Sequence, residues 1–129
     1  MRTLIASMMV LSIVQRVPNT PAPAPSPRAI VVASKPFGES YLLSEMFAQV
    51  LEARGFRVER RPGLGATEIA FAALRTNAID VYPEYTGTGL LAILGDTASR
   101  TPYDALGRVT REFRWAFDVR WRPPLGVGN

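Results

Sequence analysis

Hydrophobic and polar positions follow regular patterns from residue 29 onward. Residues 29–33 form a continuous apolar run rich in β-branched side chains, which is typical of a strand buried on both faces. Residues 39–54 place apolar side chains at helical spacing, and Gly55 stands where it can end that helix. Ser40 and Ser44 lie off the apolar stripe. The stripe, which is the face that such a helix is expected to bury, consists of Leu42, Leu43, Met46, Phe47, Val50 and Leu51.

The rest of the chain continues to alternate between strand and helix patterns. The further expected elements are a strand at 56–60, a helix at 67–76, a strand at 78–82, a helix that ends at Leu94, a helix that begins at Thr101 and Pro102, and a short strand at 119–121. This alternation predicts an α/β fold, with a mostly parallel sheet that is flanked by helices and joined by right-handed crossovers. Ligands of such open sheets bind beyond the carboxyl ends of the strands, so functional residues are expected in the connecting loops.

The first of these loops, residues 34–38, carries Lys35, the single lysine of the chain. A cation that follows a strand and precedes a helix suits an anionic group of a ligand. A solvated surface lysine is the alternative interpretation, and the residues alone do not separate the two.

The third loop, residues 83–89, combines an aromatic ring, hydroxyls and glycines just ahead of a helix. The hydroxyls of Thr86 and Thr88, with backbone N–H groups, suit a carboxylate or a phosphate. Tyr85 offers its ring face to a cation, an interaction of ~0.5–2 kcal/mol per ring. A capping turn around a buried tyrosine explains the same residues equally well.

Composition excludes several classes of function. The chain has no cysteine and no histidine, which removes disulfides, thiolate nucleophiles, Cys/His metal sites and Ser-His-Asp catalysis. Residues 29–129 hold 12 basic and 11 acidic side chains, because much of the net charge of +4 comes from three arginines in residues 1–28. No long basic patch is present, so no nucleic-acid partner is expected.

The residues of the same loops give little indication of an enzymatic function. Residues 87–92 fit a G-x-G-x-x-A dinucleotide fingerprint in form, but the acidic residue that should end the following strand falls within a predicted helix. No pair of carboxylates is brought together by its spacing, although Glu39 and Glu84 can approach one another across the loops. We therefore expect no catalytic residue, no metal site and no cofactor.

Residues 1–28 differ from the rest and are expected to be a signal peptide followed by a proline-rich linker. An apolar run at 3–14 follows a positive start and is shorter than the ~20 residues that span a bilayer. Five prolines then fall within residues 18–27. This predicts an exported protein, periplasmic or extracytoplasmic, with membrane association through an uncleaved segment at 1–15 as the alternative.

Three motifs together resemble one family. The segments VVASKPFGES at 31–40, ERRPGLGATEIA at 59–70 and IDVYPEYTGTG at 79–89 stand in the order and spacing of the substrate-binding proteins of osmoprotectant ABC transporters. The resemblance implies a type II periplasmic binding protein-like fold with two lobes. It also implies a small quaternary amine as ligand (glycine betaine, choline or carnitine) and an ABC permease subunit as partner.

By its position in these motifs, Tyr85 resembles a tyrosine of the family's aromatic cage. Lys35 and Thr88 resemble groups that hold the carboxylate of the ligand, so the resemblance favours a carboxylated ligand over choline. Gly38 stands where the family usually has threonine, which removes one hydroxyl from this corner.

The resemblance covers residues 29–126, and we expect them to form a partial substrate-binding domain, a truncated first lobe, followed by a truncated tail at 127–129. A binding or interaction module that retains half of the fold for a purpose other than transport is the alternative. An exposed apolar surface, with a tendency to associate, is expected where further elements of the family fold would pack.

A first prediction follows for the isolated chain. A pocket formed by one lobe alone leaves the ligand half solvated, and cation–π attraction is weak at such an exposed position. We expect glycine betaine to bind the 129-residue chain poorly or not at all. Titration calorimetry checks this, and micromolar affinity would contradict it.

Overall fold

The computed structural model describes residues 27–96 and 101–126. Nearly all of the predicted leader and the short tail at 127–129 therefore lie outside the described residues. Within the two described ranges, no helix combines the length and the apolar character that crossing a bilayer requires.

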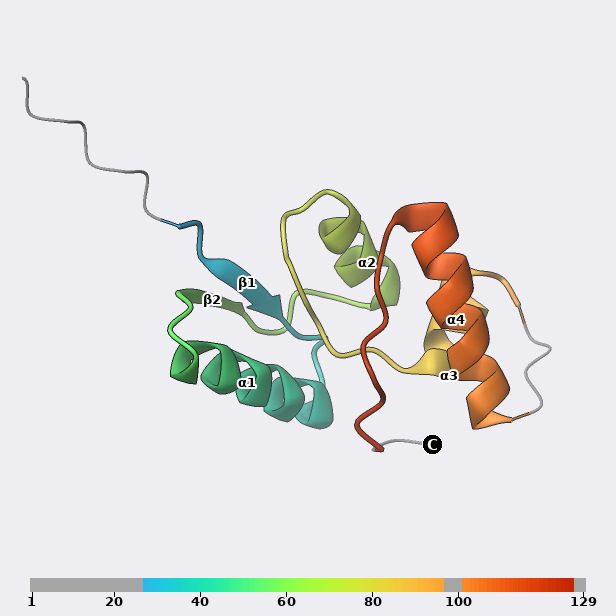
Figure 1. Cartoon of the computed structure of the whole chain (residues 1–129), viewed down its shortest axis with the longest axis horizontal. Helices are drawn as coiled ribbons and strands as arrows, with labels where there is room; N and C mark the ends of the chain where they lie inside the picture. The colour runs from blue at the N-terminus through green and yellow to red at the C-terminus, as the bar shows by residue number, and fades with distance from the viewer. Residues whose placement is uncertain (1–26, 97–100, 127–129) are drawn as a thin grey trace, which may run out of the picture.

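Strands and helices alternate along the described chain (Figure 1). In order, they are β1 (Ile30–Ala33), α1 (Gly38–Ala53), β2 (Val58–Arg61), α2 (Thr67–Arg75), α3 (Thr86–Thr88), the π-helical turn η1 (Gly89–Ile93) and α4 (Pro102–Phe117). β1 and β2 pair in parallel, from Ile30 opposite Val58 to Ala33 opposite Arg61. The expected parallel α/β arrangement is confirmed, with element ends within about two residues of the predicted ones.

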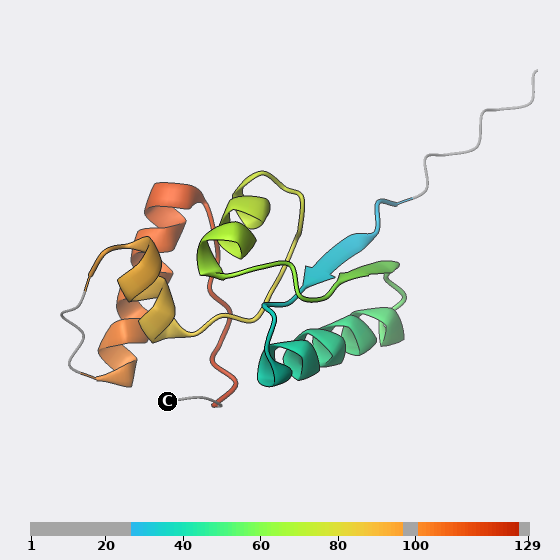
Figure 2. The ribbon, with the colours of Figure 1, turned by 180° about the vertical axis from the view of Figure 1, so that it is seen from behind.

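The helices lie on both sides of the strands. Figures 1 and 2 show α1 on one side of β1 and β2, and α2 on the other. Side chains alternate along β1 accordingly: Val31 and Ala33 pack with Ile79 and side chains of α2, while Val32 lies beside Ser44 of α1. Right-handed crossovers that run to opposite edges of a parallel strand place their helices in this way.

The third predicted strand, at 78–82, is wrong. This segment forms a single parallel bridge, Val32 with Val81, on the free edge of β1. The Asp80 carboxylate accepts the Val31 N–H at 2.7 Å, and Pro83 has no N–H to continue the ladder. A side-chain acceptor and a missing donor thus limit the pairing to one position.

The short strand predicted at 119–121 is also wrong, because this segment ends helix α4 instead. Asp118 has a left-handed backbone (φ 54°), and the Val119 N–H donates to the Phe113 carbonyl at 3.2 Å. The chain then turns back, and Trp121 packs edge-on against the Phe113 ring at 5.4 Å between centroids.

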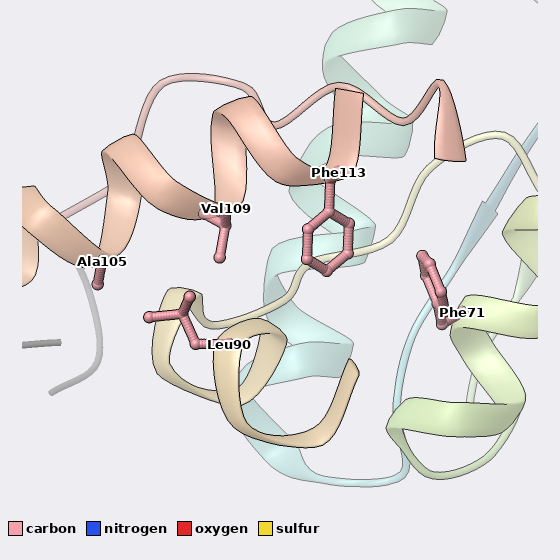
Figure 3. Packing of buried hydrophobic residues seen from close by; sticks show 5 residues of the cluster. All are labelled: Phe71, Leu90, Ala105, Val109 and Phe113. Atoms are coloured by element: carbon pink, nitrogen blue, oxygen red, sulfur yellow. The ribbon is translucent and has the colours of Figure 1, made fainter. Parts of the chain in front are cut away.

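The larger core lies between α2, η1 and α4 (Figure 3). Its buried side chains are Phe71, Leu90, Ala105, Val109 and Phe113. Trp121 covers one side of it and lies against Gly89, where a β-carbon would come within 2.7 Å of the indole. Glycine is required at this position because any side chain would displace the indole.

The expected buried face of α1 is only partly correct. Leu43 of the stripe is buried, but Leu42, Met46 and Val50 are 62%, 53% and 54% exposed. The residues that α1 buries most are small ones, with Ser40, Ser44 and Ala48 alongside Leu43. Small side chains let the helix approach the strands closely, and this rotates the larger apolar residues outward. An exposed apolar surface on α1 results.

Arg60 joins α1 to β2 through two carboxylates. Its guanidinium donates to Glu45 at 2.8 Å and to Glu52 at 2.6 Å. The hydrogen bond from Arg60 lowers the pKa of Glu45 to about 2, and the same partner lowers the pKa of Glu52.

These lowered pKa values predict an acid-sensitive contribution to stability. The contribution is fully present above the ordinary glutamate pKa of 4.5 and is lost as pH falls from there to about 2. The variant Glu45→Gln/Glu52→Gln should therefore lose stability less steeply over this range than the unmodified chain, as measured by urea unfolding. Glu68→Gln, an exposed glutamate of α2, serves as the control, and parallel curves for all three proteins would contradict the prediction.

Candidate functional site

The parallel register brings the first and third loops to the same edge. Val32 and Val81 are bridge partners, and Lys35 and Glu84 follow them at equal distances along the chain. Their side chains meet there, with Lys35 Nζ 2.5 Å from Glu84 Oε1. Both side chains are buried, at 7% and 6% exposure.

Lys35 is held from several directions. Its ammonium also donates to the Thr67 hydroxyl at 3.2 Å, and its backbone N–H donates to Ser40 Oγ at 2.9 Å. A charged group this deeply buried needs a partner of opposite charge, and Glu84 supplies it. The alternative of a solvated surface lysine is therefore wrong.

Glu84 carries two roles at once. Burial raises the pKa of its carboxyl group, and the hydrogen bond and charge of Lys35 oppose that rise. The same oxygen that pairs with Lys35 accepts the Tyr85 N–H at 2.9 Å. Burial, with a smaller effect of the Glu84 charge, raises the pKa of the neighbouring Tyr82 hydroxyl. The carboxylate thus links the buried cation to the backbone of the third loop.

Two aromatic rings stand beside this ion pair. Phe37 and Tyr85 stack with centroids 6.2 Å apart and an angle of 27° between the ring planes. Lys35 Nζ lies 5.5 Å from the Phe37 centroid and 5.6 Å from the Tyr85 centroid. Phe37 is 38% exposed, and the Tyr85 hydroxyl donates to the Glu39 carboxylate. The ring pair therefore already accommodates one ammonium group.

The structure brings together two of the three predicted site residues. Lys35 and Tyr85 are in contact, through the Lys35 ammonium and the Tyr85 ring. Thr88, at the end of α3, is partly buried and has no interaction with either of them among the described residues. Glu39 and Glu84 approach the same tyrosine from two ends, one at the hydroxyl and one at the backbone N–H.

Sequence reasoning missed Phe37, Thr67 and the pairing of Glu84 with Lys35. The pairing could have been predicted from the parallel register. Lys35 and Glu84 lie equally far along the chain from the bridge partners Val32 and Val81, and this brings their side chains to the same edge. Phe37 had no such signal in the sequence.

The other acidic residue of this segment, Asp80, pairs with Arg28 at 2.5 Å and accepts a backbone N–H of β1. Within 27–96 and 101–126, no cluster of three acidic, cysteine or histidine residues could hold a metal ion.

A family model matches residues 28–129, and it is described as OpuAC, the substrate-binding domain of ABC-type glycine betaine transport systems. The chain belongs to this family. The predicted family is thereby confirmed on residues that include both loops of the site.

Three relatives show how much of an OpuAC-type protein the chain represents. It is 38% identical over 71 residues to the glycine betaine-binding protein YehZ of Escherichia coli, a match that covers 55% of this chain and 23% of the relative. It is 31% identical over 93 residues to the carnitine transport binding protein OpuCC of Listeria monocytogenes, covering 70% and 30%. It is 38% identical over 98 residues to the glycine-betaine-binding protein of Pseudomonas aeruginosa, covering 76% and 31%.

The solved structure of apo YehZ from E. coli gives the same result for the fold. It superposes with a TM-score of 0.68 at 27% sequence identity, covering 72% of this chain and 34% of that structure. The fold is therefore α/β and periplasmic binding protein-like, of type II, as predicted. The chain spans between about a quarter and a third of the length of these relatives.

The buried ion pair leads to a stability prediction. Glu84→Gln leaves the buried Lys35 ammonium without a counter-charge, so we expect a loss of about 3–5 kcal/mol in the free energy of unfolding. The double variant Lys35→Met/Glu84→Gln removes both charges and should recover most of that loss. Urea unfolding of the variants measures both, and an unchanged stability for Glu84→Gln alone would contradict the expectation.

Proposed function

We propose that this chain provides the first lobe of an extracytoplasmic substrate-binding component of an ABC transporter that imports quaternary amines of the glycine betaine type. The observation that carries the proposal is the stacked pair of Phe37 and Tyr85, because the ammonium group of Lys35 already lies near both rings. Two relatives are glycine betaine-binding proteins and a third is a carnitine transport binding protein, which supports the same ligand class.

The chemistry of these ligands fits the site. A quaternary ammonium group donates no strong hydrogen bond, so aromatic ring faces are its natural partners. A carboxylate needs charged or N–H donors. The Lys35 ammonium has three N–H donors, of which Glu84 and Thr67 engage two, and the third is left for the carboxylate of a ligand.

In this proposal Tyr85 is a wall of the ammonium subsite, with Phe37 as a second ring. Lys35 and Thr88 hold the carboxylate end. The chain acts by binding and not by catalysis, and its partner is the permease of its transporter. Export through residues 1–28 completes the assignment, because such a component works outside the cytoplasm.

The proposal predicts weak, site-directed binding by the isolated chain. Two partly exposed rings supply about 1 kcal/mol each, so a dissociation constant of roughly tens of millimolar is expected for glycine betaine and choline. In an NMR titration, both ligands should shift resonances of Lys35, Phe37 and Tyr85. Tyr85→Ala should weaken binding roughly three- to tenfold, whereas Tyr85→Phe, which keeps the ring, should bind almost as well.

Matched controls separate this from non-specific binding. Tyr103→Ala removes a tyrosine that is 87% exposed on α4 and should leave the titration unchanged. Glycine, which lacks the methylated ammonium, should shift these resonances far less. Equal binding by the Tyr85→Ala and Tyr103→Ala variants would refute the proposed function.

A further inference from the structure

Glu39 is an exposed residue at the outer edge of the ring pair, next to the Tyr85 hydroxyl. It sits in the first turn of α1, a position where the helix dipole favours a carboxylate. Its carboxylate accepts the hydrogen bond of the Tyr85 hydroxyl. Glu84 accepts the N–H of the same residue at 2.9 Å. Tyr85 is therefore held between two carboxylates, one at each end.

The charges around the rings do not balance. Lys35 and Glu84 form a close ion pair, and each offsets the other. Within the described ranges, no lysine or arginine forms an ion pair with Glu39. The charge that remains beside the rings is therefore the negative charge of Glu39, a residue exposed to solvent.

We propose that Glu39 is a specificity-determining residue of the ammonium subsite: it orients the Tyr85 ring and supplies the negative charge that favours a cationic headgroup over a neutral one of the same shape. This deepens the proposed function and rests on it. The ring faces favour a cation only modestly where they are exposed, because burial of apolar area, which does not depend on charge, also admits neutral groups. A carboxylate at the rim adds to the modest discrimination that cation–π attraction provides.

The choice of ligand follows from the same charge. Choline carries a net positive charge, so Glu39 attracts the whole molecule. Glycine betaine is a zwitterion, and the attraction of its ammonium to Glu39 is partly offset by repulsion of its carboxylate. The contribution of Glu39 is therefore larger for choline than for glycine betaine, and absent for an uncharged analogue.

Glu39→Gln tests the proposal, because an amide still accepts the Tyr85 hydrogen bond but carries no charge. The probes are choline, glycine betaine and the tert-butyl analogue of choline, in which carbon replaces nitrogen and the charge is absent. NMR titration of the full chain should show choline binding roughly threefold weaker in Glu39→Gln, the change expected when one exposed charge is lost. Glycine betaine should lose less, and the tert-butyl analogue should bind as before.

Asp104→Asn is the matched control, since it removes one acidic charge from the first turn of α4. It should leave all three titrations unchanged, and thermal melts establish that both variants remain folded. Raised salt should weaken choline binding more in the unmodified chain than in Glu39→Gln.

The outcomes separate the two proposals. If the unmodified chain binds choline and Glu39→Gln binds it equally well, the role of Glu39 is refuted while the proposed function stands. An equal loss for choline and for the tert-butyl analogue shows a purely structural effect and also refutes it. If the unmodified chain binds choline and its uncharged tert-butyl analogue equally well, the proposed ammonium subsite fails and the role of Glu39 fails with it.

Discussion

The ion pair between Lys35 and Glu84 is the interaction on which the arrangement of the loops depends. Lys35 follows β1, its second acceptor Thr67 begins α2, and Glu84 follows the segment bridged to β1. One buried ammonium therefore ties together three connections that are far apart in the sequence. Because Glu84 also accepts the Tyr85 N–H, the position of the tyrosine is set by charge neutralisation beneath it.

The sequence predicted most of the fold, because the two hydrophobic periods are strong local signals. It also predicted that Lys35, Tyr85 and Thr88 would lie together, because parallel strands bring their carboxyl ends to one edge. Lys35 and Tyr85 do so, whereas Thr88 interacts with neither of them among the described residues. The prediction of the fold failed where a single side chain competes with the backbone. Asp80 takes an N–H of β1, and Pro83 offers none, so the third strand is reduced to one bridge. Periodicity carries no information about such local competition.

The sequence pattern also could not predict whether each site residue is buried or exposed. A lysine in a loop has the same sequence signature whether it is solvated or buried, and its burial follows from the distant Thr67 and Glu84. The orientation of α1 was missed for a related reason. Hydropathy assigns Leu42 and Met46 to the interior, whereas close approach to the strands is decided by small residues such as Ser44 and Ala48.

The contact between Trp121 and Gly89 has a practical consequence. The Gly89 N–H donates to the Tyr85 carbonyl at 2.9 Å, and the indole lies against Gly89 on the side of the core. A natural fluorophore is thus separated from Tyr85 by one glycine and one hydrogen bond. The second tryptophan, Trp115, is 86% exposed and supplies a constant solvent-like background. The fluorescence emission of Trp121 is therefore a label-free probe of changes at the Phe37 and Tyr85 rings.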